Sequence, residues 1–183
     1  QTCALPICAD LALYSAKAAG RNCHRVFEPG MEEHIKERRQ LTADLHLAIE
    51  HDEFELHYQP IVGAATGEIR SMEALIRWKH PTRGYVSPAL FVPLAEESGM
   101  INAIGEWVLM RACKEATSWP DYVTVAVNFS ALQVSRAEGI AAVRNALALS
   151  RLDPKRLELE VTESVLLARD SANLETLHEL RGL

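Results

Sequence analysis

The chain has 183 residues, of which 48% are hydrophobic and 24% charged, and its formal net charge is −6. This length fits one ordinary domain, or one domain with a small part of another. No apolar run approaches the roughly 18–20 residues that cross a membrane, and the composition is globular rather than disordered. The negative charge argues against a nucleic-acid polymer as partner, because such binding needs a basic surface. The four cysteines form no C-x-x-C pair, which favours a reducing, cytoplasmic setting.

The first residues, QTCALPI, fit no structural element well. They resemble the translation of a sequencing-adapter primer, so we interpret residues 1–8 as a leader that is not native; the alternative is a natural loop or strand. Residues 9–19 predict a helix that Gly20 closes. After a short extended piece at 24–27, a charged stretch from 31 to about 50 predicts a second helix. Its position indicates a connector between domains.

The rest of the chain predicts strands and helices in a regular order. Strands are expected at 54–62, 68–78, 123–130 and 157–164, and helices at 88–98, 101–119, 135–150 and 172–180. From Val123 onward, predicted strands alternate with predicted helices of about ten residues or more. This alternation is typical of βα units and indicates a parallel sheet.

Polar side chains occur on one face of three predicted strands. Because side chains alternate between faces along a strand, Asn128 lies opposite to the neighbouring valines, and Glu158 and Glu160 lie opposite to the leucines. Glu73 shares a face with Leu75. Strands in α/β sheets are usually apolar on both faces, and a buried carboxylate is costly unless it is paired or bound to a cation. Carboxylates with an amide oxygen suit Mg²⁺ or Mn²⁺.

Each of these residues also has an ordinary structural explanation. Glu73 could pair with a neighbour such as Arg77, Asn128 could form the turn after its strand, and Glu160 alone favours neither interpretation. Their spacing by itself therefore does not decide for a metal site. The histidines lack a metal-binding arrangement, no serine lies in a G-x-S-x-G turn, and no phosphate-binding G-x-x-x-x-G-K loop is present.

Five segments resemble the EAL family of bacterial cyclic di-GMP phosphodiesterases, in that family's order and spacing. They are LHYQPIV (56–62), MEALIRWKHP (72–81), VSPALFVPLAEESGMI (86–101), VAVNFSA (125–131) and LELEVTESVL (157–166). The preceding ADLALYSAKAAGRN (9–22) resembles the last helix of a GGDEF domain, which has the diguanylate cyclase fold. We therefore expect a GGDEF remnant at 9–28, a helical connector at 29–52 and the N-terminal half of an EAL domain at 53–183.

The resemblance implies an α/β fold, an incomplete (β/α)8 TIM-like barrel of the EAL type, with its active site at the carboxyl ends of the strands. It implies hydrolysis of cyclic di-GMP to linear pGpG with two divalent ions, Mg²⁺ or Mn²⁺. The roles carried over are metal binding by Glu73, Asn128 and Glu160, substrate contact by Gln59 and Arg77, and support of the following loop by Glu163.

A TIM barrel takes about 250 residues, and the sequence stops before the family's D-D-F-G-T-G-Y-S-S stretch. We therefore expect the intact parent to be an active, homodimeric phosphodiesterase and the chain as written to be inactive. We expect no membrane contact within this segment. Anchoring of the parent protein to a membrane through preceding regions stays open. Two alternatives also stay open: a receptor that binds cyclic di-GMP without cleaving it, and an interaction module that mediates dimerisation.

Overall fold

A computed structural model of the chain describes residues 5–18, 22–161 and 171–183. The chain divides into two compact units, Gln1–Asp44 and Leu45–Leu183. Helix α1 (Leu5–Ala18) begins four residues before the predicted start, because Pro6 falls in the first turn, where a missing backbone N–H is tolerated. Residues 24–28 belong to no helix or strand. Helix α2 (Met31–Ala48) agrees with the predicted charged helix.

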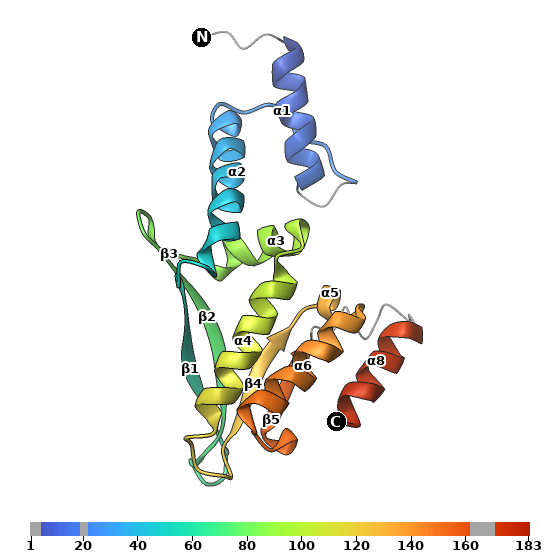
Figure 1. The fold of residues 1–183 in the computed structure, drawn as a ribbon. Coiled ribbons are helices and arrows are strands. Elements are labelled where there is room, and N and C mark those ends of the chain that lie inside the picture. The colour runs from blue at the N-terminus through green and yellow to red at the C-terminus, as the bar shows by residue number, and fades with distance from the viewer. Residues whose placement is uncertain (1–4, 19–21, 162–170) are drawn as a thin grey trace. The chain divides into compact units, whose positions relative to one another are not determined.

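The second unit contains a five-stranded sheet (Figure 1). Its strands are β1 (Phe54–Val62), β2 (Ile69–His80), β3 (Gly84–Val86), β4 (Thr124–Phe129) and β5 (Leu157–Val161). The order is β1-β2-β4-β5, and β3 pairs with β2. β1 and β2 are antiparallel, whereas β2–β4 and β4–β5 are parallel, which confirms the predicted parallel sheet. β3 was not predicted, since three residues are too few to show an alternating pattern.

Helices pack against the apolar face of this sheet and against one another. The helical elements of the second unit after β3 are α3 (Pro88–Ser98), α4 (Ile101–Ala116), α5 (Ala131–Val134), α6 (Ala137–Ser150), the short 3-10 turn η1 (Pro154–Arg156) and α8 (Ser171–Arg181). Figure 1 shows α4 and α6 side by side along the sheet, and α4 contacts β1, β2 and β4. None of the helices in the described part of the chain is long and apolar enough to span a membrane.

Helix α3 has the predicted bounds because both of its ends carry strong local signals. Pro88 occupies the first turn, and Gly99, at φ +78°, donates its N–H to the carbonyl of Glu96. In α4, the predicted apolar stripe is buried, since Ile104 and Ala112 are 3% and 0% exposed. This helix ends at Ala116 rather than at Trp119.

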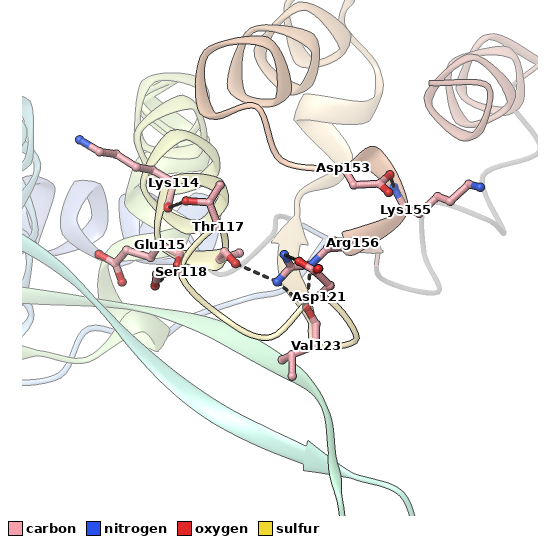
Figure 2. Close-up of polar contacts among 10 residues, drawn as sticks. Lys114, Glu115, Thr117, Ser118, Asp121, Val123, Asp153, Lys155 and Arg156 are labelled. Carbon is pink, nitrogen blue, oxygen red and sulfur yellow. Dashed lines mark hydrogen bonds and ion pairs between the residues drawn. The ribbon is translucent and has the colours of Figure 1, made fainter.

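Arg156 is a buried arginine that joins three segments of the second unit (Figure 2). Its Nε and Nη2 donate to the carbonyl of Val123 at 3.0 and 2.9 Å, and Nη2 also donates to the carbonyl of Ala116 at 2.8 Å. Nη1 lies 3.5 Å from the exposed carboxylate of Asp121. The guanidinium therefore adds a second donor, beside the N–H of Trp119, to the carbonyl of Ala116 at the end of α4, and it connects that end to the starts of β4 and β5.

We expect Arg156→Ala to lower the free energy of unfolding by about 2–4 kcal/mol, because the buried carbonyl of Val123 loses its side-chain donors and that of Ala116 keeps only the N–H of Trp119. Arg156→Lys should recover only part of this loss, since an ammonium group lacks the planar fork. The measurement is urea unfolding, with Lys155→Ala at the neighbouring exposed position as control. Equal midpoints for Arg156→Ala and Lys155→Ala would show that the contact does not stabilise the fold.

Candidate functional site

The pairing of the strands brings the predicted site residues onto one face of the sheet. Gln59 lies opposite Glu73 between β1 and β2, and Asn128 lies beside Glu160 between β4 and β5. Glu73 pairs with Ala126, which precedes Asn128 by two residues. Because paired residues point to the same side of a sheet, these side chains share the face opposite to the helices. The alternation predicted from the sequence is therefore present in the fold.

Two of the predicted metal ligands are in direct contact. The Asn128 side chain donates from Nδ2 to Oε1 of Glu73 at 2.9 Å. Glu73 is half-buried, and Asn128 and Glu160 are exposed on the open face of the sheet. The carboxylate of Glu73 is thus held at a fixed position beside the end of β4.

Glu160 lies close enough to Glu73 to interact with its charge. Partial burial, followed by the negative charges of Glu73 and Glu158, raises the pKa of the Glu160 carboxyl above its usual value. Thr124 donates from Oγ1 to Oε1 of Glu158 at 2.5 Å, which holds that second carboxylate nearby. Sequence analysis placed Glu158 on this face but gave it no role. A bound cation would reduce the electrostatic repulsion among these carboxylates.

A cavity of about 580 Å³ opens next to this cluster. Arg77, Asn128 and Glu160 line its polar side, and Val92 of α3 and Ile104 of α4 line its apolar side. Its size lies in the range of small-molecule sites. The cavity therefore joins a cation, a carboxylate and an amide to an apolar wall.

The wall of the cavity includes a buried glutamine that the sequence did not reveal. Gln133 is 3% exposed, and its Oε1 accepts the backbone N–H of Ser130 at 3.0 Å. Gly105 of α4 makes room for it, because a Cβ at that position would collide with the Gln133 amide. A glycine inside an amphipathic helix was the one available signal, and it indicates close approach without naming the partner.

Other predicted residues are not brought together in the same way. Gln59 is exposed and does not line the cavity, and Arg77 donates from Nη1 to the carbonyl of Ile76 at 3.0 Å. Glu163 lies outside the described residues. Within the described ranges, no group of three or more His, Cys, Asp or Glu side chains is arranged to hold a metal ion. Glu73, Asn128 and Glu160 offer two carboxylates and one amide, which are hard oxygen donors suited to a divalent cation.

The fold and the site define a class of protein: an α/β-barrel-type domain with an acidic site on the inner face of its strands. The sequence pattern of the EAL domain family matches residues 42–183. The chain belongs to this family.

Two curated relatives and one solved structure illustrate the similarity. The uncharacterised protein y4lL of Sinorhizobium fredii is 47% identical over 96% of this chain and 21% of its own length. The bifunctional diguanylate cyclase/cyclic di-GMP phosphodiesterase MucR of Pseudomonas aeruginosa is 44% identical over 98% of this chain and 27% of its own length. The chain thus spans about a quarter of these relatives.

The solved structure is that of the MucR phosphodiesterase in complex with cyclic di-GMP. It superposes with a TM-score of 0.74 and 45% identity, over 78% of this chain and 60% of that one. The predicted fold class, a part of an EAL-type barrel, is therefore confirmed, as is the predicted family.

The charge cluster gives a prediction for stability in the absence of metal. The folded chain raises the pKa of Glu160, so ionisation of this group weakens folding as the pH rises above the usual carboxyl range. We therefore expect Glu160→Gln to have a higher Tm than the unsubstituted chain at pH 7 in EDTA. The gain should shrink toward about pH 4, where the carboxyl is protonated.

The control for this measurement is Glu175→Gln, at an exposed position on α8. Both variants remove one negative charge, so any general effect of net charge is common to them. A Tm at pH 7 no higher for Glu160→Gln than for Glu175→Gln would contradict the proposed repulsion.

Proposed function

We propose that the intact parent protein of this chain hydrolyses cyclic di-GMP to linear pGpG with the help of divalent metal ions. The observation that carries the proposal is the position of Glu73, Asn128 and Glu160 on one face of the sheet, beside a cavity that contains Arg77. Membership of the EAL family and the similarity to a phosphodiesterase solved with cyclic di-GMP support the same substrate.

The cavity has the two kinds of wall that a nucleotide needs. Arg77 supplies a permanently charged, forked donor suited to a phosphate, and Leu75 lies two residues before it on the same face. On the opposite side, Val92 and Ile104 offer apolar surface to a base. The guanidinium is bound only to a carbonyl of its own strand in the contacts described, so it can turn to an incoming phosphate.

The acidic face would hold the metal. Glu73, Asn128 and Glu160 fit such a site because they combine hard oxygen donors with a local excess of negative charge. Bound Mg²⁺ or Mn²⁺ would supply Lewis acidity toward the scissile phosphate and lower the pKa of the attacking water. The water adds across one P–O bond of the ring, and the freed ribose oxygen takes a proton, so the product is a linear dinucleotide. The Asn128 amide keeps the Glu73 carboxylate in place for this role.

We expect Arg77→Ala to weaken binding of cyclic di-GMP by the chain by at least about tenfold, because a charge-assisted contact to phosphate is lost. Arg77→Lys should retain only part of the affinity. Isothermal titration calorimetry measures the effect, with Arg70→Ala as control at the exposed beginning of the same strand. Absence of binding by the unsubstituted chain, or an unchanged Kd for Arg77→Ala, would overturn this part of the proposal.

For the 183-residue chain itself we propose binding without efficient turnover. The predicted site residues within the described ranges supply three oxygen ligands, and water or substrate oxygens would fill the other positions around one Mg²⁺, so no further protein ligands remain for a second ion. We expect pGpG formation with Mn²⁺ to be roughly a hundredfold or more slower than by the MucR phosphodiesterase domain under the same conditions. Chromatography of the nucleotide products makes the comparison, and equal rates would contradict the expectation.

A further inference from the structure

Glu53 joins the end of helix α2 to strand β2 through three separate contacts. Its backbone N–H donates to the carbonyl of Ala48 at 2.9 Å, which closes the last turn of α2. Its carbonyl accepts the N–H of Lys79 at 2.8 Å, and its side-chain Oε2 accepts the indole N–H of Trp78 at 2.9 Å. Glu53 thus contacts both the carboxyl end of helix α2 and the last residues of strand β2.

The partner of this carboxylate is set in a rigid environment. The Trp78 side chain is fully buried, and its ring lies 6.0 Å from that of Phe54 and 5.6 Å from that of Phe91. The Glu53 side chain is only 12% exposed, and its Oε1 lies 3.7 Å from Nδ1 of His51. An indole N–H can only donate, so without this acceptor it would be buried with no partner.

Strand β2 carries residues of the candidate site on its other face. Trp78 is buried on the helix-covered face, and Arg77, its neighbour on the opposite face, lines the cavity together with Val92 of α3 and Ile104 of α4. A displacement of the Trp78 backbone therefore displaces the Cα of Arg77 with it. Leu45 and Ala48, in the last turns of α2, are both fully buried in the same unit, so that end of the helix is firmly packed.

We propose that Glu53 is a positioning residue that transmits the setting of the end of α2 to strand β2 and so controls the binding of cyclic di-GMP by Arg77. This inference rests on the proposed function for its ligand, although the coupling of α2 to β2 does not depend on the ligand. In this arrangement, a signal that twists or shifts the last turn of α2 alters the position of the guanidinium without touching the acidic face.

The first test is amide hydrogen exchange on the 183-residue chain without ligand. We expect Glu53→Ala to accelerate exchange at Trp78, Lys79 and the preceding amides of β2 by about tenfold, because local opening becomes easier. Exchange at Val125 and Val127 of β4 should stay unchanged. Unaltered rates in β2, or equal acceleration in β2 and β4, would overturn the proposal, since the second result is general destabilisation.

The second test compares affinity for cyclic di-GMP among matched variants. Glu53→Ala should weaken binding by about tenfold. Glu53→Gln keeps an acceptor for the indole and should restore both the affinity and the slow exchange of β2. His51→Ala removes the other neighbour of the same carboxylate and should leave the affinity within about twofold.

The two tests separate the inference from the function on which it rests. If the unsubstituted chain binds no cyclic di-GMP but Glu53→Ala still accelerates exchange in β2 alone, the proposed function fails and the coupling stands. If the unsubstituted chain binds and Glu53→Ala binds equally well, the positioning role of Glu53 is refuted and the proposed function stands.

Discussion

Lateral pairing of β2, β4 and β5 places the charges of the candidate site. Backbone hydrogen bonds between these strands fix Asn128 beside Glu160 and keep Glu73 within reach of the Asn128 amide. The carboxylates of Glu73, Glu158 and Glu160 repel one another, and the sheet holds them together because its other face is packed under α4 and α6. Packing on the helix-covered face thus holds the like-charged carboxylates close together on the open face. Such unfavourable charge placement is common at sites that bind a cation or a substrate.

Elements with a local signal could be predicted from the sequence. The bounds of α3 follow from Pro88 and Gly99, and the two faces of β4 and β5 follow from alternation of side chains. Elements set by distant partners could not be predicted in this way. The role of Arg156 depends on carbonyls at residues 116 and 123, and no pattern around position 156 names them.

The same distinction applies to the candidate site. Glu73, Asn128 and Glu160 were identified because carboxylates and an amide are unexpected on strands of an α/β sheet. The cavity beside them depends on how the helices pack on the sheet. The close contact of Gln133 with Gly105 in its wall could therefore be identified only from the structure. Resemblance to a known family supplied the roles of Gln59, Arg77 and Glu163, and the described residues place only the first two of these on the sheet.

The contacts of Arg156 have a consequence for the order in which the chain folds. Its two carbonyl partners are 33 and 40 residues earlier in the sequence, so the guanidinium can reach them only when the chain between residues 116 and 156 has folded back on itself. Closing loops of this length costs entropy before any contact offsets it. Before these loops close the guanidinium is solvated, and its burial accompanies the docking of residues 154–156 against the end of α4 and the start of β4.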